Sequence, residues 1–482
     1  YEIPLRLVGS EMCIRDRFST VENARQALMG CYGYMSADNA YGQAWQEVTF
    51  GYCGFGWSQT NGSSTDLLVS MDGGIDETIN TMAWRGMYKV IGETNAFIAN
   101  IADSPLESAD KLPMEAAARF LRALAYYNLA VTYGDVPLKT TPSAHDGVAV
   151  PRSPKNEIFE LVRTDWEFAY ENLPEKDDDG FATKWAAKAY LGKLYHTLGC
   201  QGDNTAWEKA KACFDEVMPK YRLADKFSDL FVDYVQGSPE SIFQLNFALA
   251  GSTTRNRGSW LVAPNGSCNG QAWDRIRASK ALYDYFLATY PGDPRIESTF
   301  LTYWKSYAGV GKGEKPKEEP IASARDTVYA YPYFTYTIEG EEKPAGWKKP
   351  KLYVGRIPYE KLADPASPKA EELYAMIADT ATATPAEKGY LKGLLSLLEN
   401  ATKKPSTNTK SWPYFKKPWD PEQSGNNSHK NLILYRYADM LLMAADVYNE
   451  LGQTDKAITL ANEVLKLSLI HISEPTRRRG IS

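Results

Sequence analysis

The sequence is poor in several features that define common functional classes. Its 482 residues include only 4 histidines and 6 cysteines, and acidic residues outnumber basic ones, giving a net charge of −6. A nucleic-acid-binding surface needs an excess of basic residues, so we expect no nucleic-acid partner. No apolar run approaches the roughly 18 residues that a membrane-spanning helix requires.

Motifs of common catalytic sites are absent as well. The sequence contains neither the His-Glu-x-x-His pattern of zinc proteases nor the Gly-x-Ser-x-Gly pattern of serine hydrolases. GVGKGE at 309–314 lacks the Lys-Ser/Thr ending of a phosphate-binding loop. DDDG at 177–180 has its glycine too early for an EF-hand and is interpreted as a solvated turn. We therefore expect no enzyme activity, metal or cofactor. A glycosidase carboxylate pair stays an alternative, although no two carboxylates are singled out.

The two ends do not continue the patterns beside them. Residues 1–17 and 467–482 contain LVGSEMCIRDR and LSLIHISEPTRRRGIS, which resemble translated sequencing-adapter DNA. We expect both segments to be artefacts and exclude them from the fold prediction. Five cysteines then remain, without Cys-x-x-Cys spacing, which favours buried thiols. A disulfide between Cys200 and Cys213 is the alternative.

Helical patterns are abundant in what remains. In FLRALAYYNLAVTYGDVPL at 120–138, the apolar spacing predicts one helical face, formed by Phe120, Leu124, Tyr127 and Val131. Gly134 and Pro137 predict the end of this helix. We predict that Arg119 and Arg122 pair with carboxylates or helix-end carbonyls and do not bind ligand.

Pairs of helices show the packing pattern of tetratricopeptide (TPR) hairpins. Small residues and aromatic ones alternate in the pair at 183–218, with Leu191, Gly192 and Tyr195 on the first predicted helix and Ala210 and Phe214 on the second. The same pattern recurs at 438–465. Further helices are predicted at 20–35, 75–101 and 153–173.

The fold class that follows is mainly α, with a TPR-like helical-hairpin scaffold and an inserted irregular subdomain of loops and short strands. Within the insert, strands are predicted at 241–247 and 328–337. The predicted domains are an N-terminal helical scaffold at 18–220 with a Gly/aromatic-rich loop at 36–74, an insert at 221–431 that carries the ligand side, and a truncated C-terminal hairpin at 432–466.

Aromatic residues are the most distinctive part of the composition, with 31 Tyr and 12 Trp. Aromatic rings cover the flat C–H faces of sugars, while amides and carboxylates bind the hydroxyls. The predicted glycan-binding residues are Tyr52, Trp57, Asn61, Asp66, Trp260, Trp273 and Trp304. The alternative is that these tryptophans fill small cores under long loops. Among them, Trp57 is the predicted stacking platform and Asn61 the neighbouring hydrogen-bonding group.

Four segments, in order, resemble the SusD/RagB family of surface glycan-binding lipoproteins. They are WRGMYKVIGETNAFI at 84–98, RFLRALAYYNLAVTYGDVPL at 119–138, ATKWAAKAYLGKLY at 182–195 and LILYRYADMLLMAADVYNELG at 432–452. The resemblance covers about residues 20–465. It implies non-catalytic capture of oligosaccharide at the outer-membrane surface and delivery to a SusC-type TonB-dependent barrel. It also implies a lipid anchor on an N-terminal cysteine that this chain lacks.

Three other functions stay open. A peptide-binding, RagB-type member of the same family would share the fold and differ in ligand. A helical-scaffold glycosidase would reveal itself through a carboxylate pair whose mutation abolishes turnover. A TPR adaptor that binds only protein would not need an aromatic-lined ligand surface away from its hairpins.

Overall fold

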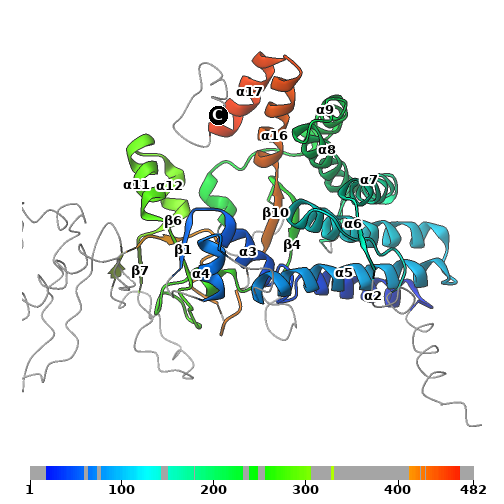
Figure 1. Ribbon diagram of the computed structural model, residues 1–482, viewed down its shortest axis with the longest axis horizontal. Helices are drawn as coiled ribbons and strands as arrows, with labels where there is room; N and C mark the ends of the chain where they lie inside the picture. Colours follow the sequence, from blue (N-terminus) through cyan, green and yellow to red (C-terminus); the bar gives the residue numbers. More distant parts are fainter. Residues whose placement is uncertain are drawn as a thin grey trace, which may run out of the picture.

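The computed structural model describes residues 18–58, 63–72, 78–142, 150–177, 180–231, 238–247, 256–305, 327–330, 412–423, 425–428 and 430–466. Both ends that the sequence marks as artefacts lie outside these residues, so that prediction stays open. The described part is mainly helical, as predicted. Figure 1 shows the helices forming an arc on one side and a region of short elements on the other.

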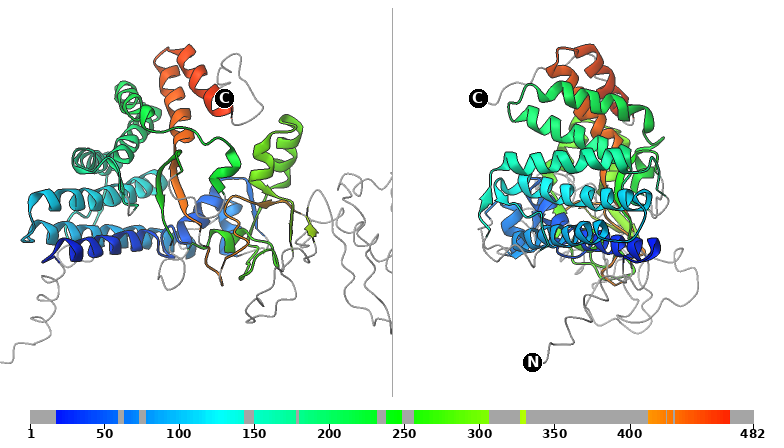
Figure 2. Two further views of the ribbon diagram at one scale, coloured as in Figure 1. Left: turned by 180° about the vertical axis from the view of Figure 1, so that it is seen from behind. Right: turned by 90° about the vertical axis from the view of Figure 1, so that its right-hand side faces the viewer.

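The arc begins with a layer of long helices. These are α2 (Val21–Met35), α5 (Thr78–Ala102) and α6 (Ser108–Tyr133), which lie against one another in Figures 1 and 2. The Thr20 side chain accepts a hydrogen bond from the Asn23 N–H and so caps the first of them. Gly134, at φ 74°, ends α6 where the sequence predicted. Val131 is 51% exposed, because the last turn of α6 extends beyond its buried stretch, so the predicted face is one turn too long.

The arc continues through helical hairpins. They are formed by α7 (Lys155–Asn172), α8 (Lys184–Cys200), α9 (Ala206–Val217), α16 (Tyr437–Glu450) and α17 (Thr454–Leu465). The predicted packing of small residues against aromatic ones is found in the first hairpin, because a Cβ on Gly192 would lie only 2.4 Å from the Phe214 ring. We define α2, α5 to α9, α16 and α17 as the helical scaffold.

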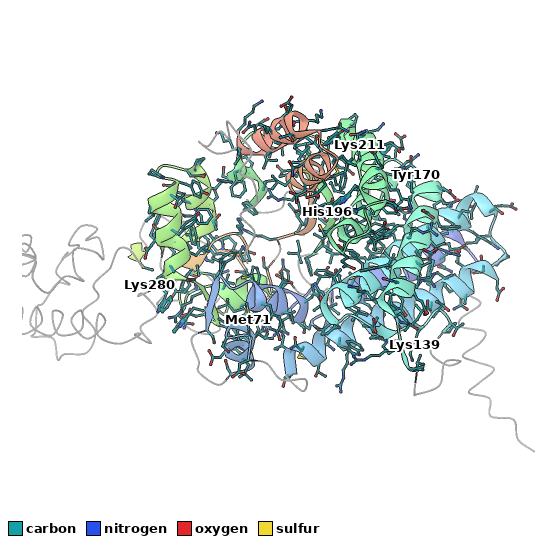
Figure 3. The ribbon with its side chains drawn as sticks, turned by 45° about the horizontal axis from the view of Figure 1, so that its top comes forward. Met71, Lys139, Tyr170, His196, Lys211 and Lys280 are labelled. Carbon is teal, nitrogen blue, oxygen red and sulfur yellow. The ribbon has the colours of Figure 1, made fainter. Side chains whose placement is uncertain are left out.

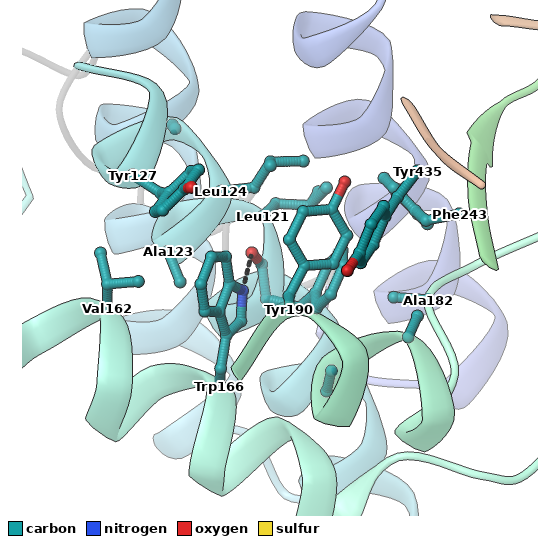
Figure 4. Packing of buried hydrophobic residues seen from close by; sticks show 14 of the residues in the cluster. Leu121, Ala123, Leu124, Tyr127, Val162, Trp166, Ala182, Tyr190, Phe243 and Tyr435 are labelled. Carbon is teal, nitrogen blue, oxygen red and sulfur yellow. Dashed lines mark hydrogen bonds between the residues drawn. The ribbon is translucent and has the colours of Figure 1, made fainter. Parts of the chain in front are cut away.

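One large core holds the helical scaffold together. Figure 4 shows Trp166 and Tyr190 between the helices, with Phe243 and Tyr435 reaching the same cluster from two strands. The Trp166 indole N–H donates to the Phe120 carbonyl oxygen, so this ring is buried with its polar group satisfied. The strands are β4 (Ser241–Leu245) and β10 (Leu432–Arg436), which pair antiparallel and tie the C-terminal hairpin to the rest.

The arginines of α6 are structural, as predicted. Arg122 forms two hydrogen bonds of 2.8 Å with the fully buried Asp165 of α7 and a third with Asn95 of α5. Arg119 pairs with Glu115 and reaches Asp165 at 3.4 Å. These contacts link three helices and leave the guanidinium of Arg122 buried inside the helical scaffold.

The second region, which we call the insert, is built from short elements. Residues 36–72 connect the two regions, because β1 (Gly56–Ser58) pairs with β5 (Ile276–Ala278) of the insert, whereas Tyr41, Trp45 and Leu68 are buried in the core of the helical scaffold. The predicted loop at 36–74 contains two helices that its composition did not predict, α3 (Ala44–Tyr52) and α4 (Ser64–Val69). The buried face of α3 explains the first, because Ala44, Trp45 and Val48 line up at helical spacing.

The remaining elements of the insert and its borders are short. They are β2 (Val136–Pro137), β3 (Arg152–Ser153), η1 (Met218–Lys220), η2 (Phe227–Phe231), α10 (Gly258–Val262), α11 (Lys280–Thr289), α12 (Pro294–Thr299), β6 (Phe300–Leu301), β7 (Tyr303–Lys305), β8 (Thr327–Tyr329) and β9 (Tyr414–Phe415). The predicted strand at 241–247 is confirmed by β4, whereas only the start of the one at 328–337 lies in the described residues.

The five described thiols match neither expectation fully: they are not all buried, and Cys200 and Cys213 form no disulfide. Cys31, Cys213 and Cys268 are buried thiols, so Cys213 does not form the alternative disulfide with Cys200. Cys200 and Cys53 are exposed, which corrects the expectation that all five thiols are buried. None of the helices in the described ranges is long and apolar enough to cross a membrane.

Candidate functional site

Most of the predicted ligand residues lie in the insert, around the β1–β5 ribbon. Figure 3 places Lys280 and Met71 on that side of the molecule, across from Tyr170 and Lys211 of the helical scaffold. In the ribbon, Trp57 of β1 lies opposite Arg277 of β5. The ribbon therefore brings a predicted platform residue next to a buried arginine that the sequence did not single out.

Trp57 is half-buried and stacks on a second tryptophan. Its ring lies 4.2 Å from that of Trp412, with only 9° between the ring planes. The Arg277 guanidinium lies 5.4 Å from the Trp57 ring centre, and the Lys280 ammonium lies 5.7 Å from the Trp412 ring centre. Trp57 is therefore one member of a stack flanked by cations rather than an isolated platform.

A second stack has the same composition. The rings of Trp260 of α10 and Trp273 have centres 4.0 Å apart and an angle of 24° between their planes. The backbone N–H of Trp273 donates to the backbone carbonyl of Trp260. The Arg257 guanidinium lies 5.4 Å from the Trp260 ring and that of Arg275 lies 3.7 Å from the Trp273 ring. Trp273 is 39% exposed, and because Trp260 covers one face of its ring and Arg275 the other, the exposed part is the ring edge. We call Trp57, Trp412, Trp260 and Trp273 the tryptophan face.

A buried carboxylate fixes the arginine of the second stack. Glu47 of α3 is fully buried and pairs with Arg275 at 3.2 Å. The same carboxylate accepts a 2.5 Å hydrogen bond from the Thr65 hydroxyl and one from the Gln43 amide. Arg275 is thereby held over the Trp273 ring, and its charge is compensated inside the protein.

The first stack has a corresponding pair. Asp274 and Arg277 are both fully buried and joined by two hydrogen bonds of 2.7 and 2.8 Å. Burial raises the pKa of the Asp274 carboxyl to about 6, and the bonds from Arg277 and the Tyr414 hydroxyl oppose that rise. Because each stack has an arginine already paired with a carboxylate, the tryptophan face suits an uncharged ligand better than an anionic one.

The other predicted site residues have separate positions. Tyr52 is the last residue of α3, and its hydroxyl accepts a hydrogen bond from the Asn80 side-chain amide of α5. Asp66 lies in the first turn of α4, where Ser63 caps its N–H. Trp304 of β7 is only 4% exposed and packs in a small core with Leu301, Ala330 and Tyr414. Its position fits the packing alternative. Asn61 lies outside the described residues.

Sequence reasoning missed Trp412, the two arginines Arg275 and Arg277, and the carboxylates Glu47 and Asp274 that pair with them. Trp412 follows a long stretch without a clear pattern, and Glu47 and Asp274 carry no motif. The one available signal was the alternation Trp273, Arg275, Arg277, which places an aromatic ring and two cations within five residues of a predicted ligand segment.

A groove of about 640 Å³ lies elsewhere, between α2 and α5. Its lining includes Phe18, Gln26, Tyr34, Glu93 and Asn100, and none of the predicted site residues. Among the described residues no cluster of His, Cys, Asp and Glu has metal-binding geometry. The chemistry gathered on the tryptophan face is that of binding: flat apolar rings with nearby exposed amides such as Gln271.

Two family models match the sequence of this chain, and both describe SusD-like proteins. A model described as "Starch-binding associating with outer membrane" matches residues 28–196, and one described as "SusD family" matches residues 239–466. The chain belongs to the SusD/RagB family. The two SusD models leave residues 197–238 unmatched, so α9 lies outside both, and the second model includes every residue of the second tryptophan stack.

SusD-like relatives and structures extend the comparison. SusD-like protein P2 of Formosa agariphila is 26% identical over 237 residues, 48% of this chain and 46% of the relative, so the match spans about half the relative's length. A SusD superfamily structure from Parabacteroides distasonis has a TM-score of 0.67 at 18% identity, covering 94% of this chain and 82% of that one. A laminarin-binding SusD-like protein has a TM-score of 0.61 at 19% identity, covering 93% and 84%. The SusD-like fold is therefore shared at low identity.

Proposed function

We propose that this protein captures oligosaccharides without catalysis at the outer-membrane surface and delivers them to a SusC-type TonB-dependent transporter. The observation that carries the proposal is the tryptophan face, made of two stacked indole pairs that are both contacted by cations of the segment 275–280. Family membership supports the carbohydrate class, and a structural neighbour is described as laminarin-binding. The transporter and the membrane surface are inferred from the family alone.

The geometry indicates how a sugar would bind. Trp273 exposes the edge of its ring, because Trp260 and Arg275 cover its two faces, and Trp57 is half-buried, so both can contribute partial apolar contacts to a pyranose ring. Gln271 is exposed and lies two residues before Trp273 in the chain, so its side-chain amide can hydrogen-bond the hydroxyls of a sugar bound there. Because Arg275 and Arg277 are paired with buried carboxylates, we expect neutral glycans to bind better than uronic-acid or sulfated ones.

Calorimetry against a defined panel tests this function. The panel contains neutral oligosaccharides of starch, laminarin and xyloglucan type, an acidic oligosaccharide, and peptides. We expect the wild type to bind a neutral glycan, and Trp273→Ala and Trp57→Ala each to lose about 2 kcal/mol or more, roughly thirtyfold in affinity. Trp185→Ala is the matched control, because Trp185 is a half-buried scaffold tryptophan that also contacts lysines.

The outcomes separate the alternatives. Binding of peptides but no glycan would keep the family and replace the ligand class. Turnover of a glycan by the wild type would contradict non-catalytic capture. Equal affinity in the wild type and both site variants, with their melting temperatures unchanged, would move the site away from the tryptophan face.

A further inference from the structure

The most unusual feature of the insert is the fully buried pair Asp274 and Arg277. Both side chains are 0% exposed, and the carboxylate and guanidinium meet through Nε–Oδ1 and Nη2–Oδ2 contacts of 2.7 and 2.8 Å. A buried ion pair of this kind is often no more stabilising than apolar residues of similar volume. The raised pKa of Asp274 has the same origin, because burial disfavours the charged form of the carboxyl group. The presence of the pair therefore calls for a reason other than stability.

The backbone at Asp274 supplies one part of that reason. Asp274 has φ 53°, in the left-handed region that non-glycine residues rarely adopt. It stands between Trp273 and Arg275, whose guanidinium lies over the Trp273 ring at 3.7 Å. The left-handed turn thus sets the direction in which Trp273 leaves the chain, and the bonds to Arg277 hold that turn.

Arg277 supplies the other part. It occupies the position opposite Trp57 in the β1–β5 ribbon, and its guanidinium lies over the rings of Trp57 and Tyr414 at 5.4 and 5.6 Å. The Tyr414 hydroxyl also bonds to Asp274. One ion pair therefore contacts the first stack through Arg277 and the turn that carries the second stack through Asp274.

We propose that Asp274 and Arg277 are positioning residues that fix the relative orientation of Trp57 and Trp273 for ligand binding. The proposal rests on the proposed function, because it concerns the geometry of that same face. The two rings come from segments more than two hundred residues apart in the chain. The ion pair links them rigidly, so a ligand meets a face that is already ordered and loses less entropy on binding.

The test uses the full chain labelled with 5-fluorotryptophan and observed by fluorine NMR, with each resonance assigned from single Trp→Phe variants. Asp274→Asn keeps the size of the side chain and its tolerance of the left-handed conformation, but removes the charge. We expect the resonances of both Trp57 and Trp273 to shift or broaden, while that of Trp166 in the scaffold core stays unchanged. Glycan affinity should fall about tenfold or more.

Two further variants make the test decisive. Asp293→Asn is the matched control, because Asp293 pairs with Arg295 in the same insert and is nearly buried. It should leave both resonances and the affinity unchanged. Asp274→Asn combined with Arg277→Met removes both charges, so no unpaired charge is left to unfold the protein. We expect it to melt close to the wild-type temperature and still to show displaced rings and weakened binding.

Several results would overturn the proposal. One is a charge-free double variant that folds and keeps the Trp57 and Trp273 resonances and the glycan affinity of the wild type. A change at only one of the two rings would show that the pair does not link them. Failure of the double variant to fold would show that the pair holds the fold itself. If the wild type binds no glycan, the proposed function fails, while the fluorine resonances still decide whether the pair positions the rings.

Discussion

The helical scaffold and the insert bury their residues in different ways. The helical scaffold has one continuous core, into which aromatic residues from most of its helices, from β4 and β10, and from Tyr41 and Trp45 at the start of the segment 36–72 converge. The insert has several small clusters, such as the one formed by Leu301, Trp304, Ala330 and Tyr414. Short elements cannot build a large core, so the insert relies on stacked rings and buried ion pairs for its order.

The difference explains where a ligand surface can form. In the scaffold, a large aromatic residue such as Trp166 is completely buried, and its polar atom is satisfied by a backbone carbonyl. In the insert, Trp273 keeps more than a third of its surface exposed while stacked on Trp260. Rings that are ordered yet partly open are suited to binding, because the ligand does not have to immobilise them.

The largest effect is expected from breaking the buried pair of the scaffold. Asp165→Ala leaves the guanidinium of Arg122 buried, with the Asn95 amide oxygen as its remaining side-chain hydrogen-bond acceptor among the described residues, so the free energy of unfolding should fall by about 3–5 kcal/mol. Denaturant titration measures the change. Glu160→Ala is the control, because it breaks an exposed pair with Arg163 that is worth about 1 kcal/mol or less. Equal losses in the two variants would contradict the structural role of the Arg122–Asp165 pair.

A cavity in the same core comes next. Leu124 is 2% exposed on α6, so Leu124→Ala should cost about 2–5 kcal/mol of stability. Glycan affinity of the folded fraction should not change, because the scaffold is not part of the tryptophan face. Calorimetry well below the melting temperature checks this. Lost affinity with stability intact would place α6 in the site and remove the distinction between the two regions.

The smallest effect concerns a cation within the insert. The Lys417 ammonium lies 5.0 and 5.2 Å from the rings of Phe227 and Phe231. Burial, with smaller effects of Arg436 and Arg295, lowers the pKa of Lys417 from 10.5 to about 8. Between pH 8 and pH 10.5 the Lys417 side chain is therefore more fully protonated in the unfolded chain than in the folded protein. The free energy of unfolding consequently increases as the pH rises through this range.

The comparison that isolates this effect is between the wild type and Lys417→Met. We expect the melting temperature of the wild type to rise relative to that of the variant between pH 7 and pH 9.5, values that bracket the lowered pKa. Tyrosine ionisation affects both proteins alike and cancels in the difference. A difference that stays constant with pH would mean that Lys417 keeps its ordinary pKa.

The two regions also differ in how much of them the sequence predicts. The scaffold follows from local rules: Thr20 and Thr183 start helices, Gly134 ends one, and Gly192 faces Phe214. Each of these depends on residues close in the chain or on a repeated hairpin pattern. Even the pairing of Arg122 with a carboxylate could be predicted in kind, although its partner could not.

The insert depends on contacts that no local pattern encodes. Trp57 meets Trp412 across a long stretch of chain, and Glu47 reaches Arg275 from a different element. The composition indicated aromatic and amide chemistry, which is why Trp57, Trp260 and Trp273 were named. It could not distinguish them from Trp304, because exposure is decided by tertiary packing and not by the neighbouring residues.

Hydrogen exchange with and without the tightest-binding neutral glycan of the panel tests the central claim most directly. The account predicts that the glycan slows exchange in residues 52–58 and 256–278, which carry Trp57, Trp260 and Trp273 of the tryptophan face, and leaves α5 to α9 unchanged. Slower exchange confined to α2 and α5, which line the separate groove, would contradict it. So would slower exchange spread over the hairpins of the scaffold, because the ligand would then bind the helical region and not the insert.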